Sequence, residues 1–177
     1  SDDDGITWNE IDTKLMMTNS RSKSGLQEPG VLQLENGVIW MYARTDMGYQ
    51  YESYSLDDGN SWTNIQPSLF TSPLSPLSVK RNPNDNKLVA IWNPIPDYNG
   101  RYITQKSRTP FVIATSSDDA NTWSEYKYVE SDPNRGYCYT AMHFTDTALL
   151  LGYCGGIVDK GQLNELVIKK IQLTELP

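Results

Sequence analysis

SLDDGNSW, Ser55 to Trp62, decides how this chain folds, because the same eight-residue pattern occurs three times. SDDDGITW fills residues 1–8 and SSDDANTW fills residues 116–123, so successive copies begin 54 and 61 residues apart. Each copy reads Ser-x-Asp-x-Gly-x-(Ser/Thr)-Trp, with Ala120 in place of glycine in the third. Repeats of about 50 to 60 residues are typical of propeller blades. The pattern therefore predicts a row of similar β-sheet modules.

The chemistry of the motif indicates a turn that joins two strands. An aspartate can accept hydrogen bonds from backbone amides just ahead of it, and Gly59 can adopt a positive φ. The tryptophan then buries a large ring against its own hairpin, so we expect Trp8, Trp62 and Trp123 to be largely buried. We interpret each copy as a structural staple. Calcium binding is the alternative, although the D-x-D-x-D-G series with a distal glutamate is missing.

Composition excludes several classes of function. The 177 residues can form one core, and the 38% of hydrophobic residues together with the 12 glycines make up about 45% of the chain, as in an ordinary globular protein. The net charge of −7 disfavours a nucleic-acid partner, whose phosphates require clustered Lys and Arg. No run approaches 18 apolar residues, so we expect no membrane span. The compartment stays open.

Metal and disulfide chemistry have weak support. The sole histidine, His143, fits a core or strand position better than a ligand role, and no cluster of metal ligands stands out, so we expect no metal or cofactor. Cys138 and Cys154 lie symmetrically about residue 146 and could oppose each other in a tight hairpin. The sequence alone is compatible with two free thiols and with a disulfide.

Runs of apolar and alternating residues predict antiparallel strands and no helix of useful length. The clearest is a hairpin over Pro29 to Arg44, split by Asn36-Gly37. We expect further strands at 49–55, 75–81, 88–93, 108–116, 136–144, 148–154 and 165–173, and an outer strand within 11–23. Pro94 to Ser107 is a polar loop long enough to indicate function. The fold class is all-β, a propeller of four-stranded antiparallel blades.

The alternating direction of strands within a blade sorts residues onto two faces. The three staples fall on one face, and the starts of first and third strands and the ends of second strands fall on the other. This topology brings together residues from three blades on the face opposite the staples: Glu28, Arg44, Arg108 and Tyr139. Because the innermost strand lines the central channel, Glu28 and Tyr139 should lie near the axis.

These segments also resemble a known family. The repeated SxDxGxxW box, QEPGVLQLENGVIWMYAR, RTPFVIATSSDDANTW and GYCYTAM are together similar to the sialidase (neuraminidase) superfamily, six-bladed propellers with Asp-boxes, over about residues 1–155. The resemblance implies that Tyr139 is the nucleophile and Glu28 its partner base. It implies that Arg44 and Arg108 belong to an arginine triad that binds the carboxylate of an anionic sugar.

The resemblance implies an exo-acting, retaining glycosidase of sialidase type in a divergent branch, since Pro29, Gly30 and Cys154 depart from the common pattern. A neutral phenol is a suitable nucleophile beside a sugar carboxylate, because a second carboxylate would be repelled. Two alternatives stay open, a non-catalytic carbohydrate-binding propeller and a structural propeller that presents loops to a protein partner.

The family's first triad arginine and its acid-base aspartate have no matching segment. A six-bladed ring needs about 300 to 360 residues, so we expect residues 1–177 to be the C-terminal part of a single propeller domain, about three blades. We further expect this part alone to be inactive and to pack against the missing N-terminal half or a second copy.

Overall fold

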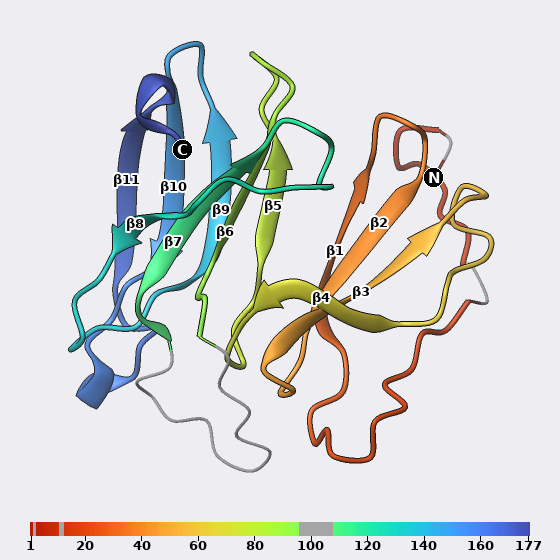
Figure 1. Ribbon diagram of the computed structural model, residues 1–177, viewed down its shortest axis with the longest axis horizontal. Coiled ribbons are helices and arrows are strands. Elements are labelled where there is room, and N and C mark those ends of the chain that lie inside the picture. The colour runs from red at the N-terminus through yellow and green to blue at the C-terminus, as the bar shows by residue number, and fades with distance from the viewer. Residues whose placement is uncertain (2, 11–12, 96–107) are drawn as a thin grey trace.

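The computed structural model describes residues 1, 3–10, 13–95 and 108–177, and it consists of three antiparallel sheets (Figure 1). The first sheet has the order β1-β2-β3-β4. Its strands are β1 (Gln27–Gln33), β2 (Ile39–Arg44), β3 (Tyr49–Ser55) and β4 (Gln66–Thr71). The second sheet, β5-β6-β7-β8, comprises β5 (Ser78–Arg81), β6 (Leu88–Trp92), β7 (Phe111–Ser116) and β8 (Lys127–Glu130).

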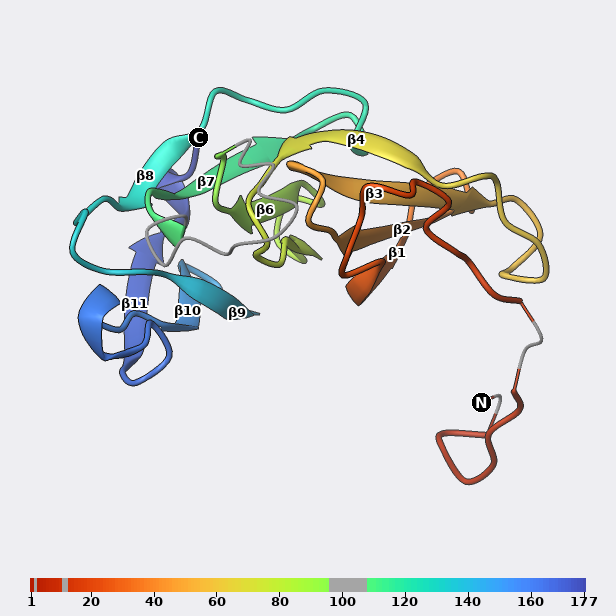
Figure 2. The same cartoon turned by 90° about the horizontal axis from the view of Figure 1, so that it is seen from below.

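The third sheet has the order β11-β10-β9. Its strands are β9 (Cys138–Phe144), β10 (Ala148–Cys154) and β11 (Leu166–Gln172), and two short 3₁₀ helices, η2 (Val158–Lys160) and η3 (Leu173–Glu175), flank β11. Seen from below, the three sheets lie side by side like blades of a fan (Figure 2). The predicted all-β architecture, part of a propeller, is confirmed.

The predicted hairpin in the first sheet forms as the sequence indicates. Residues 34–38 close the turn, where the Leu34 amide donates to the Val38 carbonyl at 2.8 Å. Gly37 has a φ of 85°, a conformation that glycine adopts without a steric penalty. The hairpin therefore has a fixed register, in which Gln27 pairs with Arg44 at the open end.

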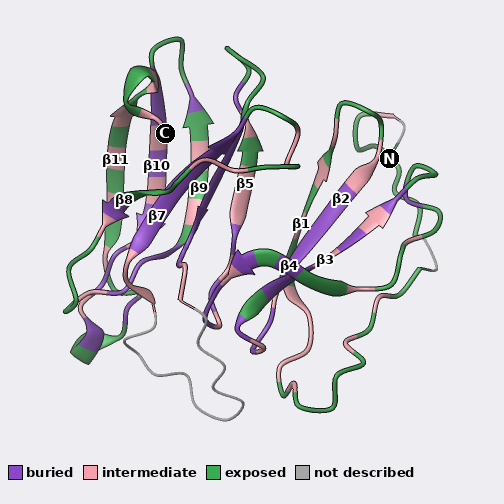
Figure 3. Ribbon diagram, in the orientation of Figure 1, coloured by how far each residue is buried: buried purple, intermediate pink, exposed green. Residues whose placement is uncertain are grey.

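Two apolar clusters join the sheets. The first lies between the first and second sheets and is rich in aromatic rings, including Trp40, Phe70 and Trp92. Phe70 contacts Trp92 edge to face, with ring centroids 5.0 Å apart. The second lies between the second and third sheets. The middle sheet is covered on both faces, and β6 and β7 are accordingly buried along their whole length (Figure 3).

Each Asp-box forms the same hydrogen-bonded turn, and the second and third boxes join β3 to β4 and β7 to β8 as the predicted staples. The carboxylate of Asp57 accepts hydrogen bonds from the backbone amide of Ser61 at 2.8 Å and from the hydroxyl of Ser55 at 2.9 Å. Trp62 Nε1 donates to the carbonyl of Gly59 at 3.0 Å. Asp3 and Asp118 accept the equivalent backbone bonds. These bonds lower the pKa of all three aspartates, the hydroxyl at the seventh box position having the largest effect.

The prediction of buried indoles fails for Trp8 and holds in part for the other two. Trp8 is 79% exposed, while Trp62 and Trp123 are half-buried. The first box lies outside the three sheets (Figure 2), so its ring has no blade to pack on. The described residues 13–23 likewise form no strand, contrary to expectation. Most of the polar loop of 94–107 lies outside the described residues.

Candidate active site

Two residues with unusual backbone conformation face each other where inner strands begin. Glu28 has a φ of 49° and Tyr139 a φ of 58°, a left-handed conformation that is costly for residues with a side chain. Both lie at register shifts, one between Gln27 and Gly30 of β1 and one in β9 opposite β10. A β-bulge redirects a side chain, and such strain is concentrated at functional sites.

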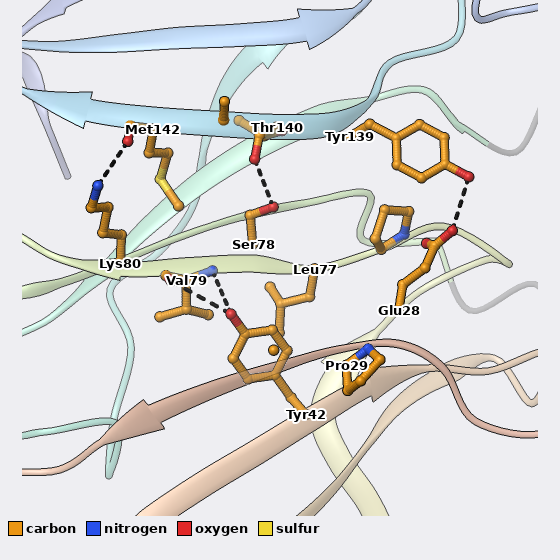
Figure 4. A pocket seen from close by; sticks show the side chains of 13 residues that line it. Glu28, Pro29, Tyr42, Leu77, Ser78, Val79, Lys80, Tyr139, Thr140 and Met142 are labelled. Carbon is orange, nitrogen blue, oxygen red and sulfur yellow. Dashed lines mark hydrogen bonds between the residues drawn. The ribbon is translucent and has the colours of Figure 1, made fainter. Parts of the chain in front are cut away.

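The bulged residues contact each other and an arginine. The Tyr139 hydroxyl donates to Glu28 Oε1 at 3.1 Å (Figure 4). Arg44 Nη1 lies 3.0 Å from Glu28 Oε2 and donates to the Tyr139 hydroxyl at 3.2 Å. Tyr139 is 40% exposed, so its ring remains accessible. The structure thus brings together three of the four residues predicted from topology.

Arg108, the fourth, lies against the other side of the tyrosine. Its guanidinium carbon is 5.5 Å from the centroid of the Tyr139 ring, within cation–π range. Arg108 Nη1 donates to Cys138 Sγ at 3.1 Å, and Nη2 donates to the carbonyl of Leu74 at 3.4 Å. One face of the Tyr139 ring therefore lies near the Arg108 guanidinium, while the hydroxyl contacts Glu28.

The cysteine question is settled in favour of free thiols. Cys138 and Cys154 pair across β9 and β10, as their symmetry in sequence allowed, and both are free. Burial raises the pKa of Cys138 to about 11, and the nearby Arg108 opposes this in part. The Cys138 thiol is therefore protonated near neutral pH and serves as the acceptor for Arg108.

Gln27 is a residue of the site that the sequence interpretation missed. Its Oε1 accepts from Arg44 Nη2 at 2.6 Å and from Arg44 Nε at 3.2 Å. The sequence feature that could have identified Gln27 is its position, because it immediately precedes Glu28 and pairs with Arg44 in the hairpin. With these bonds in place the Arg44 side chain is only 11% exposed.

An open groove of about 720 Å³ extends from Glu28 and Tyr139 between the inner strands β1, β5 and β9 (Figure 4). Lys80 Nζ donates to the carbonyl of Met142 at 3.0 Å across it. Ser78 Oγ likewise donates to the carbonyl of Thr140 at 3.1 Å. These bonds tie β5 to β9 and leave the groove open beside β1.

The described part of the chain contains no cluster of three His, Cys, Asp or Glu side chains that could hold a metal ion. Among the same residues, no helix is long and apolar enough to cross a membrane. The chemistry available at the site is that of Glu28, Tyr139 and the two arginines. A phenol beside a carboxylate that can take its proton is an activated nucleophile, and guanidinium groups bind carboxylates.

The fold defines a class, the sialidase-like propellers with Asp-boxes. The sequence matches the BNR repeat-like domain family over residues 1–151, most of its length. The chain therefore belongs to this family. A comparison with curated proteins found no match.

Solved structures with the same fold include two sialidase-type enzymes. The NanB sialidase from Streptococcus pneumoniae has a TM-score of 0.71 and 17% identity, over 100% of this chain and 27% of that one. The intramolecular trans-sialidase from Ruminococcus gnavus has a TM-score of 0.70 and 19% identity, over 99% of this chain and 37% of that one. At these identities the structural similarity shows the fold alone.

An enzyme acting on a different sugar is a more distant match. The alpha-L-arabinanase from Penicillium chrysogenum has a TM-score of 0.53 and 18% identity, over 86% of this chain and 49% of that one. In all three comparisons the chain spans less than half of the length of the solved structure. These three structures are those of a sialidase, a trans-sialidase and an arabinanase, and the chain corresponds to part of each.

Proposed function

We propose that the protein is a retaining, exo-acting glycosidase of sialidase type whose substrate ends in an anionic sugar. The observation that carries the proposal is the contact of the Tyr139 hydroxyl with Glu28 and Arg44. A protein that only binds sugar needs no base against a tyrosine. If the protein only bound sugar, or only presented loops to a partner, neither this contact nor the strained backbone of Glu28 and Tyr139 would serve a purpose.

The chemistry follows from these positions. Glu28 takes the phenolic proton as the Tyr139 oxygen attacks the anomeric carbon, and the bond to the leaving oxygen breaks. Free tyrosine has a pKa of about 10, so an adjacent base is needed for attack near neutral pH. Water then attacks the same carbon and gives its proton to the group that earlier protonated the leaving oxygen, while the tyrosyl bond breaks and the phenol recovers its proton from Glu28. Configuration is retained because there are two displacements.

Arg108 and Arg44 supply the charge for the sugar carboxylate. Both remain cationic at any relevant pH, and a guanidinium binds a carboxylate by charge-assisted hydrogen bonds. In the site they flank Tyr139 from two directions. A carboxylate held between them would lie next to the attacking oxygen.

The leaving oxygen requires a proton donor, which we assign to a part of the propeller not included in residues 1–177. We accordingly propose that this chain is the C-terminal part of one propeller domain. Its working form has further blades, or a second copy, packed against it.

The test compares two fluorogenic substrates, an α-sialoside and an α-L-arabinofuranoside, the latter as a neutral sugar. Turnover is measured for residues 1–177 with the upstream segment of the protein added. The proposal expects release from the sialoside, and a sugar adduct on the Tyr139 peptide after acid quench and mass spectrometry. Release from the arabinofuranoside alone, or an adduct on another residue, would contradict it.

A further inference from the structure

The bonds made by Arg44 point to a role for its neighbour Gln27. The edge of a guanidinium formed by Nε and one Nη is the edge that normally grips a carboxylate with two parallel bonds. In Arg44 this edge is filled by Gln27 Oε1, at 3.2 and 2.6 Å. Only Nη1 remains directed at Glu28 and Tyr139.

The neutrality of Gln27 matters as much as its geometry. A carboxylate in this place would make the same two hydrogen bonds but would cancel the arginine's charge, beside the negative charge already on Glu28. The amide oxygen orients the guanidinium and leaves one positive charge for the site. Since the Arg44 side chain is 11% exposed, water does little to screen that charge.

The hairpin provides this arrangement directly. Gln27 and Arg44 are paired residues across β1 and β2 at the open end of the hairpin. The register shift that follows Gln27 turns Glu28 toward Tyr139. One short segment thus supplies the base and the group that orients the cation.

We propose that Gln27 is a positioning residue that fixes Arg44 and preserves its charge, so that the site favours an anionic sugar. The inference rests on the proposed function, and it gives the reason why the site would prefer an anionic sugar to a neutral one. Gln27 itself touches neither the reacting atoms nor, in this arrangement, the substrate.

The experiment uses three variants of the chain, assayed with the upstream segment present. Gln27→Met removes the acceptor at similar size, and Gln27→Glu keeps the acceptor but adds a charge. Gln33→Met, an exposed glutamine on the same strand, is the matched control. The first readout is the Arg44 Nε–H signal in ¹H–¹⁵N spectra, assigned by its loss in Arg44→Lys. The second is kcat/KM for a sialoside relative to its neutral methyl ester.

Gln27→Met should lose the slowly exchanging Arg44 signal and lower kcat/KM for the sialoside about 10- to 100-fold. Gln27→Glu should keep the signal yet lower the preference for the sialoside over its ester about tenfold. Gln33→Met should change neither. A retained signal in Gln27→Met, or full charge preference in Gln27→Glu, would overturn the inference.

The two readouts separate this inference from the proposed function. If the wild-type protein turns over neither the sialoside nor its methyl ester, the proposed function fails, and the spectra alone decide whether Gln27 positions Arg44. In that case, loss of the Arg44 signal in Gln27→Met, with an unchanged unfolding midpoint, supports the positioning role of Gln27. Persistence of the signal refutes it.

Discussion

The Tyr139 hydroxyl donates to Glu28 Oε1 at 3.1 Å across 111 residues of sequence. Each partner lies at a register shift of an inner strand, and each has a positive φ without being glycine. Regular strands would direct these two side chains by simple alternation, whereas the bulges set their direction independently of the rest of the strand. The same local cost therefore occurs at both ends of one hydrogen bond.

Replacement of Tyr139 by phenylalanine removes only the hydroxyl. We expect turnover of a sialoside to fall about 10³-fold or more while the dissociation constant changes little, because the ring and both arginines stay in place. Single-turnover kinetics and calorimetry measure the two quantities. Tyr128→Phe, at an exposed ring on β8, is the matched control and should leave both unchanged. Wild-type turnover by Tyr139→Phe would show that another group attacks the sugar.

Arg108→Ala should act on binding. A hydrogen bond to a charged group contributes about 1.5 to 3 kcal/mol, so affinity for an anionic sugar should fall about 10- to 100-fold. Lys87→Ala serves as control, because Lys87 is an exposed cation at the opposite end of the sheets that pairs only loosely with Asp85 at 3.6 Å. Calorimetric titration with the free sugar acid measures the effect. Equal affinity in Arg108→Ala would exclude this arginine from the carboxylate site.

The two cysteines should differ in reactivity. The thiolate is the reactive form, and burial raises the pKa of Cys138 to about 11, so few Cys138 side chains are ionised at pH 8. Cys154 is more exposed. Iodoacetamide should therefore modify Cys154 first, as peptide mass spectrometry over a time course can measure. Faster modification of Cys138 would mean that β9 opens in solution.

The sequence was sufficient for the fold because its signals are local. The Asp-boxes, the Asn36-Gly37 turn and the alternating runs each depend on neighbouring residues, and strands formed at almost every predicted run. Strand direction alone then placed Glu28, Arg44 and Tyr139 on one face. β4 and β8 were not located, because their short, polar outer strands carry no apolar period.

Other features depend on distant contacts and could not be predicted this way. Trp8 belongs to a perfect copy of the box, yet its burial depends on a blade that the box does not itself encode. The bulges at Glu28 and Tyr139 leave no mark in residue type, since neither is glycine. The hydrogen bonds that Arg44 donates to Gln27 depend on the exact pairing of β1 and β2, which residue patterns define only to within a residue or two.

Acid should weaken the fold through the Asp-boxes. Hydrogen bonds lower the pKa of Asp57 in the folded protein, so its contribution to stability is present above the unfolded value near 4 and is lost as pH falls through the folded value. Asp57→Asn should lower the unfolding midpoint at neutral pH and flatten its decline in acid. Asp3→Asn should do neither, because its box lies outside the sheets (Figure 2) and its hydrogen bonds, all within residues 1–7, do not depend on folding of the sheets. Thermal unfolding followed by circular dichroism between about pH 3 and pH 7 measures both. Equal effects at the two positions would contradict the staple role.

The outer face of the third sheet leads to the last prediction. Leu166 and Ile168 are 74% and 70% exposed on β11, whereas the alternate residues Val167 and Ile171 pack against the core. Neighbouring exposed apolar residues on a sheet that the described chain leaves uncovered are typical of an interface. In the proposed full propeller another blade would cover them.

We therefore expect residues 1–177 alone to self-associate and to hydrolyse a sialoside very slowly, since a missing general acid typically lowers the rate about 10²- to 10⁴-fold. The double variant Leu166→Lys, Ile168→Lys should increase the monomer fraction in sedimentation velocity without changing the fold. Leu163→Lys, at an exposed leucine in the loop before β11, is the control and should not. Adding the upstream segment in trans should restore turnover to the wild-type chain, and the double variant should respond less because its interface carries two charges. Robust hydrolysis by the isolated chain as a monomer would show that it contains its own acid, and the half-propeller interpretation would then be wrong.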